Sequence, residues 1–421
     1  MREMKDSGIE WIGEVPNDWR IVRNKNAFVC NKELVGEKSE LTQLLSLTTR
    51  GIKKKDINNA EGKLPESFDT YQFVKENDIV MCLFDLDCSA VFSGISPFDG
   101  MISPAYRVLS CKESMEPRYA DYWFRYISDG RKFNHYAKNI RYTLSYEEFS
   151  ALPLLLPEKS EQRSIADYLD RKCSQIDAII ARQQEVIEKL KTYKLSVITE
   201  AVTKGLNPNV PMKDSGVEWI GEIPEHWEML KLKYASSILR GKFNHRPRND
   251  PAYYDGIYPF VQTGDVARAN KYIKKYSQTL NEKGYAVSKV FPANSICMTI
   301  AANIGDVAIL TFDACFPDSV VGFVQSKNIT WNYLYYVLTA MKQQFVRNAI
   351  ISTQLNLNIE IIKEEFIPVA PLHIQEQISE FLDNKCLSID RTISAKQFVI
   401  DKLADYKKSL IYEVVTGKKE V

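Results

Sequence analysis

The sequence predicts a mixed α/β protein in which one unit, a globular domain followed by a long helix, is present twice. Three observations predict this fold class. A segment near the start returns in the middle of the chain, two heptad-patterned segments each close one copy, and short apolar runs alternate with helical patterns between them. With 421 residues, 45% hydrophobic and 26% charged, the chain is long enough for two domains that each bury a core.

The repeat is the strongest of these signals. Residues 4–19 return as residues 212–227, 208 positions later, with 12 of 16 positions identical. A period of this length indicates a duplicated domain, because solenoid repeats recur about every 20 to 50 residues. The predicted order is an N-terminal lead at 1–19, a domain at 20–156, a long helix at 157–205, a linker with the second lead at 206–227, a second domain at 228–370 and a second long helix at 371–421.

Two helical segments, 169–203 and 382–416, repeat the same pattern. Apolar residues recur at alternating spacings of four and three over about five heptads without Pro or Gly, which is typical of a coiled coil. The two helices pair most simply with each other, and a pseudo-two-fold relation between the units would make them antiparallel. At 1.5 Å per residue, each segment would form a rod of about 50 Å. Gln183 and Lys396 occupy seam positions and are candidates for fixing the register.

One irregularity concerns where these helices begin. Glu161-Gln162 ends seven residues before Leu169, whereas Glu376-Gln377 ends five residues before Leu382. This difference predicts helix starts that are not equivalent in the two copies.

The segments between lead and helix read as mixed α/β. Apolar runs at 78–83 and 295–300 predict strands, and residues 119–126 and 332–338 predict helices whose aromatic side chains belong to the core. The two domains agree in outline but share little identity. Similar scaffolds with different surfaces are typical of two binding modules for two different targets.

Composition excludes several classes of protein. No run of 18 apolar residues is present and no apolar signal segment follows Met1, so we expect a cytoplasmic protein without membrane contact. The eight cysteines form no Cys-x-x-Cys pattern and only four histidines occur, which favours reduced thiols over a metal or disulfide framework. The net charge of +1 neither requires nor excludes nucleic-acid binding, because a chain can be basic on one face only.

Enzyme motifs are incomplete. Residues 250–253 (Asp-Pro-Ala-Tyr) resemble the Asp-Pro-Pro-Tyr motif of amino-methyltransferases, but one Pro is missing and no Gly-rich strand-to-helix loop for S-adenosylmethionine is found. Pro317-Asp318 with residues 325–327 (Gln-Ser-Lys) resembles a nuclease site in which Gln replaces a metal-ligating carboxylate. The phosphate-binding loop of ATPases is absent. The sequence therefore predicts no catalytic residue and no metal site.

The lead, Asp-Ser-Gly-(Ile/Val)-Glu-Trp-Ile-Gly-Glu-(Val/Ile)-Pro, resembles that of the specificity subunits of type I restriction-modification systems. The domain exits at 152–162 and 367–377 resemble the same family, and so does the order of lead, domain and helix. This resemblance implies two target-recognition domains separated by two long antiparallel helices, each domain reading one half of a bipartite site in double-stranded DNA. It also implies that the helices set the spacing and dock two modification (methyltransferase) subunits, which restriction (motor-nuclease) subunits join.

The resemblance further implies that this chain is not an enzyme and binds no cofactor itself. S-adenosylmethionine would be bound by the partner methyltransferase, and ATP with Mg by the restriction subunit. Two alternatives stay open: a self-contained DNA modification enzyme, and a coiled-coil assembly scaffold that does not bind DNA.

Candidate DNA contacts lie where cations stand beside turn-forming residues. Lysines typically meet phosphates, whereas Arg, Asn and Gln can contact base edges in the major groove. Solvated charge is the competing interpretation for each cluster, and a helix N-cap at Ser145 or Asn358 competes for the segments 141–145 and 354–358. The candidates are Arg50, Lys53, Lys54, Lys55, Lys138, Arg141 and Tyr142 in the first domain, and Arg240, Lys242, Asn244, Arg246, Arg248, Lys271, Lys274, Gln354 and Asn356 in the second.

Overall fold

The computed structural model describes residues 2–49, 51–56, 65–86, 92–137, 142–325, 328–351 and 356–421. The chain forms two compact units: unit 1 comprises Met1–Gln184 and Phe398–Val421, and unit 2 comprises Glu185–Gln397. Two long helices, α4 (Lys159–Lys204) and α11 (Leu372–Val415), contribute a segment to each unit. Each unit thus holds one globular domain and parts of both helices, and the predicted mixed α/β fold with an internal duplication is confirmed.

The repeated lead forms a hairpin in each unit. The hairpins pair β1 (Met4–Asp6) with β2 (Glu14–Pro16), and β13 (Met212–Asp214) with β14 (Glu222–Pro224). In both, an aspartate carboxylate accepts the N–H of a glycine two residues on, at 2.9 Å for Gly8 and 3.0 Å for Gly216. These glycines have φ of 67° and 72°, a left-handed conformation that favours glycine. The repeated sequence therefore specifies the same local structure twice.

The domain of unit 1 is built on a small antiparallel sheet. Its elements are β3 (Arg20–Arg23), α1 (Asn24–Ala27), β4 (Phe28–Asn31), η1 (Gly36–Leu41), β5 (Leu45–Thr48), β6 (Gly51–Lys54), β7 (Gln72–Val74), β8 (Ile79–Met81), β9 (Ser93–Ile95), β10 (Gly100–Ile102), β11 (Arg107–Cys111), α2 (Pro117–Asp129), η2 (Lys132–His135), α3 (Tyr146–Ala151) and β12 (Pro153–Leu156). The main sheet has the order β4–β11–β8–β9, and β3 pairs with β12. Tyr119, Trp123 and Phe124 of α2 are fully buried, as predicted for core aromatic residues.

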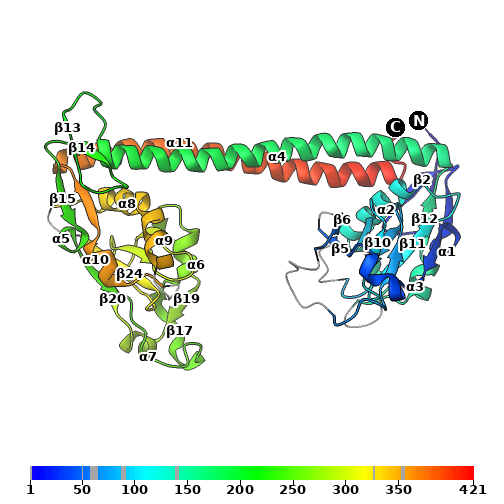
Figure 1. Cartoon of the computed structure of the whole chain (residues 1–421), viewed down its shortest axis with the longest axis horizontal. Coiled ribbons are helices and arrows are strands. Elements are labelled where there is room, and N and C mark those ends of the chain that lie inside the picture. The colour runs from blue at the N-terminus through cyan, green and yellow to red at the C-terminus, as the bar shows by residue number, and fades with distance from the viewer. Residues whose placement is uncertain are drawn as a thin grey trace. The chain divides into compact units, whose positions relative to one another are not determined.

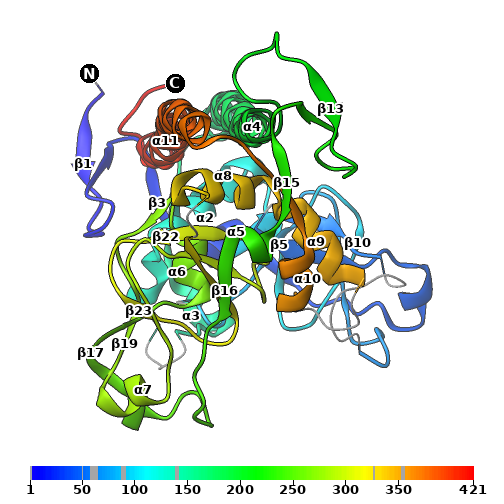
Figure 2. The ribbon, with the colours of Figure 1, turned by 90° about the vertical axis from the view of Figure 1, so that its left-hand side faces the viewer.

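The domain of unit 2 has a larger set of elements. They are β15 (Glu228–Lys231), α5 (Leu232–Ala235), β16 (Ser236–Arg240), η3 (Pro251–Tyr253), β17 (Tyr254–Phe260), α6 (Thr263–Arg268), β18 (Tyr272–Ile273), β19 (Gln278–Leu280), α7 (Glu282–Ala286), β20 (Val290–Phe291), β21 (Ile296–Thr299), β22 (Val307–Leu310), β23 (Ala314–Cys315), β24 (Val320–Gln325), α8 (Trp331–Ala340), α9 (Lys342–Ile351), α10 (Ile359–Glu364) and β25 (Phe366–Val369). One sheet has the order β16–β24–β21–β22–β18 and a second β19–β17–β23–β20. Figures 1 and 2 place β17, β19 and α7 at the end of this unit farthest from α4 and α11.

These elements confirm the predicted strands and helices of both domains. The runs at 78–83 and 295–300 contain β8 and β21, and the helical patterns at 119–126 and 332–338 lie in α2 and α8. In both domains the core is a sheet with one helix packed against it. Helix α2 buries Tyr and Trp side chains in this core, and helix α8 buries Tyr and Leu side chains.

Helices α4 and α11 run antiparallel in each unit, and their paired segments appear in Figures 1 and 2. In unit 1, Lys407 Nζ lies 2.6 Å from a carboxylate oxygen of Asp177, and in unit 2, Lys194 Nζ lies 2.7 Å from one of Asp390. The two lysines are 213 positions apart in the sequence, and so are the two aspartates. The two ion pairs are therefore equivalent under the duplication. The predicted seam is confirmed by the burial of its apolar members, such as Leu169, Cys173, Ile176, Leu382, Cys386, Ile389, Leu410 and Val414.

The two helices start at equivalent positions, so the prediction of unequal starts was wrong. Lys159 and Leu372 are 213 positions apart, the same interval that separates Leu169 from Leu382. The residue equivalent to Gln162 is Gln375, whereas Gln377 is exposed. The matching Glu-Gln pairs had suggested the wrong alignment of the exits.

Gln162 and Gln375 are fully buried and make the same three hydrogen bonds. Gln162 Oε1 accepts Glu116 N–H at 2.8 Å, and its Nε2 donates to the oxygens of Ser114 and Pro157 at 2.9 and 2.8 Å. Gln375 does the same with its own domain, accepting from Thr330 N–H at 2.8 Å. A buried amide with no bonding partner would cost free energy, so these contacts define where each helix leaves its domain.

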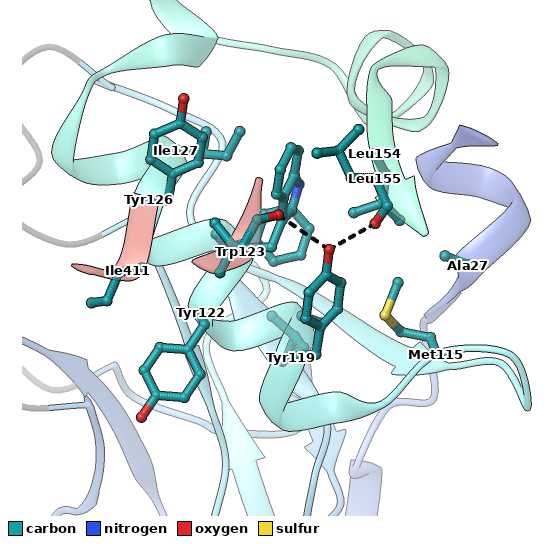
Figure 3. Close-up of a cluster of buried hydrophobic side chains, with 14 of the residues drawn as sticks. Ala27, Met115, Tyr119, Tyr122, Trp123, Tyr126, Ile127, Leu154, Leu155 and Ile411 are labelled. Carbon is teal, nitrogen blue, oxygen red and sulfur yellow. Dashed lines mark hydrogen bonds between the residues drawn. The ribbon is translucent and has the colours of Figure 1, made fainter. Parts of the chain in front are cut away.

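A buried tyrosine ties the end of one helix to the exit strand of each domain. Tyr119 OH donates toward Leu155 O at 3.1 Å and lies 3.5 Å from Val415 O in α11 (Figure 3). Tyr333 OH takes the equivalent position in unit 2, 3.0 Å from Pro368 O and 3.2 Å from Val202 O in α4. Desolvation by burial raises the pKa of both phenols, so they remain neutral donors.

Candidate nucleic-acid interface

Five of the candidate residues of unit 2 gather on the end of β16 and the loop that follows it. Arg240, Lys242, Asn244, Arg246 and Arg248 are all exposed. Phe243 in the same loop is buried against Phe260, with ring centroids 5.4 Å apart, so the loop is anchored to the second sheet. The backbone is therefore held by an apolar contact while its polar side chains face solvent.

Asp318, in the turn between β23 and β24, binds three of these arginines. Arg248 Nη2 lies 2.5 Å from both carboxylate oxygens, Arg246 Nη2 lies 3.5 Å from one, and Arg240 Nε donates to the main-chain oxygen at 2.7 Å. A Cβ at Gly241 would lie 2.2 Å from Pro317 O, so glycine permits this close approach. Three guanidinium groups against one carboxylate leave a surplus of positive charge, and we call this group the Asp318 cluster.

The methyltransferase-like residues 250–253 have structural roles. Asp250 accepts the N–H of Ala252 at 3.0 Å as the N-cap of η3, and its other oxygen lies 2.9 Å from His245 Nε2. The Ala252 N–H bond, followed by the contact with His245, lowers the pKa of Asp250. The His245 ring stacks on Tyr253 at 3.8 Å. These residues brace the loop of the Asp318 cluster.

In unit 1, the candidate lysines lie on the β5–β6 hairpin. Lys53 and Lys54 are exposed, and Lys54 Nζ lies 4.7 Å from the Phe98 ring centroid. Lys55 is half-buried, and its N–H donates to Leu44 O at 2.8 Å. Arg50, from the same predicted cluster, lies outside the described residues.

The segments just before the domain exits are partly described. Lys138, Arg141 and Gln354 lie outside the described residues. Tyr142 is 38% exposed with a φ of 45°, and Asn356 is exposed.

The competing N-cap interpretation is confirmed at both segments. Ser145 forms a capping box with Glu148 at the start of α3, and Asn358 accepts the N–H of Glu360 at 3.0 Å at the start of α10. These two residues therefore stabilise helix starts.

Two further candidates precede and follow β18. Lys271 is largely buried, forms an ion pair with Asp383 of α11, and lies 4.9 Å from the Tyr336 ring centroid. Its ammonium group is thus engaged within unit 2. Lys274 is exposed on the other side of β18.

Sequence reasoning missed the structural roles of three residues, Asp318, Gln162 and Gln375. Asp318 was considered as a nuclease carboxylate, not as the partner of arginines some 70 positions earlier. Gln162 and Gln375 were visible in the sequence, but the signal that identifies them is the constant interval of 213 positions. Contacts between distant segments have no local sequence pattern that would reveal them.

Among the residues that the structure describes, no group of three His, Cys, Asp or Glu side chains could hold a metal ion. No helix in that part of the chain is long and apolar enough to cross a membrane. The arrangement offers exposed cations on two different scaffolded surfaces, which suits electrostatic binding of a polyanion.

Comparisons with known proteins agree with this architecture. The chain is 26% identical over 431 residues to the putative type I restriction enzyme MjaX specificity subunit of Methanocaldococcus jannaschii, covering 97% of this chain and 95% of the relative. It is 25% identical to the type I restriction enzyme MjaVIII specificity subunit of the same organism, covering 96% and 93%.

Solved structures share the fold. A chain from a structure of a type I R-M system superposes with a TM-score of 0.72 at 14% identity, covering 96% of this chain and 99% of that chain. The HsdS subunit of Thermoanaerobacter tengcongensis gives 0.50 at 15% identity, covering 96% and 98%.

Residues 224–396 match the family model of the type I restriction modification DNA specificity domain, which defines the class of the second domain. The duplication places a domain of the same architecture in unit 1. Over nearly its whole length the chain is similar to specificity subunits of type I restriction-modification systems.

Proposed function

We propose that this chain is the sequence-specific DNA-binding subunit of a type I restriction-modification complex, and that each domain reads one half of a bipartite site. The observation that carries the proposal is the contrast between buried and exposed residues of the two copies. The buried contacts at Gln162 and Gln375 are the same, whereas the exposed cations lie on a hairpin in unit 1 and around Asp318 in unit 2. Two similar scaffolds with different exposed donors suit two different base sequences.

The paired helices α4 and α11 would set the spacing between the half-sites and dock two modification subunits. The equivalent ion pairs Lys194–Asp390 and Lys407–Asp177 support a fixed register for this pairing. The restriction subunits would join the larger complex. S-adenosylmethionine would be bound by the partner methyltransferase, and ATP with Mg by the restriction subunit. This chain would contribute no catalytic group.

We propose that the DNA-contacting residues come from both domains. They are the described candidates of unit 1 (Lys53, Lys54, Lys55 and Tyr142), those of unit 2 (Arg240, Lys242, Asn244, Arg246, Arg248, Lys271, Lys274 and Asn356), and Arg50, Lys138, Arg141 and Gln354 outside the described residues.

The test is a domain exchange in the complete complex. Replacing residues 228–370 with the corresponding domain of another family member should change one half-site and leave the other unchanged, as measured by sequencing of methylated bases in the host. The reciprocal exchange of residues 20–156 is the matched control and should change the other half-site. If either exchange altered both halves together, the modular interpretation would fail.

The alternatives have their own readouts. The purified chain should not transfer methyl groups from S-adenosylmethionine to DNA without its partners, and activity of the chain alone would identify a self-contained modification enzyme. A complex that assembles but methylates the same sites after both exchanges would identify a scaffold.

A further inference from the structure

The Asp318 cluster places a carboxylate in the middle of an exposed cationic surface. Arg246 and Arg248 have side chains that are 55% and 49% exposed, whereas Asp318 is 33% exposed. A carboxylate at this place repels DNA phosphates, so on charge alone it opposes binding. Its position needs another explanation.

We propose that Asp318 is a positioning residue that fixes the arginines of its cluster in the orientation in which they contact one DNA half-site. This inference rests on the proposed DNA-binding function. Guanidinium groups that lie close together repel one another unless a negative group lies between them. Asp318 supplies that group for Arg246 and Arg248 through its carboxylate, while its main-chain oxygen accepts a hydrogen bond from Arg240 Nε.

The contacts of Asp318 leave donors for a ligand. Arg240 uses Nε toward Asp318, and among the described residues none bonds its two Nη nitrogens. Arg248 uses Nη2, and its Nε and Nη1 have no partner in that part of the chain. A guanidinium with two donors available matches paired acceptor oxygens or the O6 and N7 edge of guanine. The shared ligand chemistry is therefore a pair of acceptors on duplex DNA, either on a phosphate or on a guanine.

Several contacts limit the freedom of this surface. Arg246 Nη1 donates to Phe243 O and His245 O at 2.8 Å, which fixes the loop around the buried Phe243 ring. Gly241 allows the loop to approach Phe316 and Pro317 closely. Fixed donors lose less conformational entropy on binding, which favours recognition of one geometry over others.

The substitution Asp318→Asn separates positioning from charge because the two effects have opposite signs. It removes one negative charge, so a simple surface carboxylate would give tighter binding to every DNA when it is replaced. A positioning residue would instead give weaker binding to the cognate site while unrelated DNA is bound slightly more tightly. We expect cognate affinity to fall about tenfold, within the range for loss of one bidentate base contact.

The experiment uses the complex with its modification subunits, one duplex carrying the site identified by methylation sequencing, and one unrelated duplex of equal length. Asp255→Asn is the matched control, since it makes the same charge change at an exposed position of β17 in the same domain. Asp318→Glu, which keeps the carboxylate, should recover part of the cognate affinity. A duplex altered in only one half-site shows whether the loss is confined to that half.

The outcomes are distinct. A fall in the ratio of cognate to unrelated affinity for Asp318→Asn, without such a fall for Asp255→Asn, supports positioning. If both variants bind both duplexes more tightly than wild type by the same factor, the positioning role is overturned. If the wild-type complex does not distinguish the two duplexes, the proposed function fails. If wild type distinguishes them and Asp318→Asn distinguishes them equally well, only the inference about Asp318 fails.

Discussion

Unit 1 and unit 2 hold their domains to their helices through the same hydrogen bond. Tyr122 OH donates to Asp170 at 2.8 Å, and Tyr336 OH donates to Asp383 at the equivalent positions of unit 2. Desolvation by burial, followed by the hydrogen bond to the carboxylate, raises the pKa of both tyrosines, so each stays a neutral donor. The duplication has kept this contact in both copies.

The ion pairs around the same carboxylates differ. Arg118 binds Asp170 at 2.8 Å in unit 1, but the residue equivalent to Arg118 is Asn332. Asp383 is paired instead by Lys271, which precedes β18, an edge strand of the five-stranded sheet. The Arg118–Asp170 pair is exposed, and exposed ion pairs contribute little free energy, whereas a buried hydrogen-bonding group without a partner is costly. The comparison shows which contacts the two copies need in common and which can vary with the surface.

The largest effect is expected at the shared buried contacts. Gln162→Ala and Gln375→Ala each remove three hydrogen bonds and leave buried backbone groups without partners, so each should lower the free energy of unfolding by about 3 kcal/mol. Chemical denaturation of the purified chain, with a probe that reports the unfolding of each unit separately, measures this loss of free energy. Gln377→Ala, at the exposed residue, is the control and should change little. Very different losses at Gln162 and Gln375 would contradict the equivalence of the two exits.

A smaller effect is expected where the two surfaces differ. Replacing the three lysines at 53–55 with glutamine should weaken binding of the complex to cognate and unrelated DNA alike, by about tenfold at low salt, and reduce the slope of log affinity against log salt by about two to three. The same change at Lys25, Lys32 and Lys75, all exposed elsewhere in the same domain, is the control. An unchanged slope would assign the hairpin lysines to a solvated face.

The smallest effect concerns an ion pair that unit 1 lacks. Hydrogen bonds from Lys231 and Lys233 lower the pKa of Glu364 from 4.5 to about 2. Because the pKa is lower in the folded chain, this carboxylate contributes stability above about pH 4.5, and the contribution disappears as the pH falls toward about 2. Ala151 stands at the equivalent position of unit 1.

The difference in Tm between wild type and Glu364→Gln tests this contact. We expect a loss of about one degree at pH 7, which is typical of exposed pairs, and no difference near pH 2. Asp255→Asn is the control, because it makes the same charge change at an exposed residue that forms no ion pair with any residue the structure describes. A difference that persists at pH 2 would show that the carboxylate charge is not its cause.

Much of the architecture could be predicted from the sequence because its signals are local or periodic. The Asp6-Ser7-Gly8 lead returns as Asp214-Ser215-Gly216 and forms the same turn, since the carboxylate and the glycine act within three residues. The heptads of α4 and α11 identified a coiled coil because a helix repeats its buried face along one segment.

Part of the candidate site could be predicted in the same way. The cationic loop around Arg246 and Arg248 was visible as charge beside Gly and Pro, but the carboxylate that organises it was not. Asp318 stands about 70 positions away, and no spacing rule connects the two segments. Only the packing of β16 beside β24 brings them together.

By itself, the sequence determined the duplication, the two paired long helices, the repeated lead and the clusters of cations beside turn-forming residues. Only the tertiary structure decided that Gln162 and Gln375 make the same buried hydrogen bonds, that Lys271 is engaged by Asp383, and that Asp318 lies against the arginines of its cluster. The physical reason is that a periodic pattern reports which face of an element is buried, whereas a hydrogen bond or ion pair depends on where another segment places its partner. That placement is a property of the folded chain.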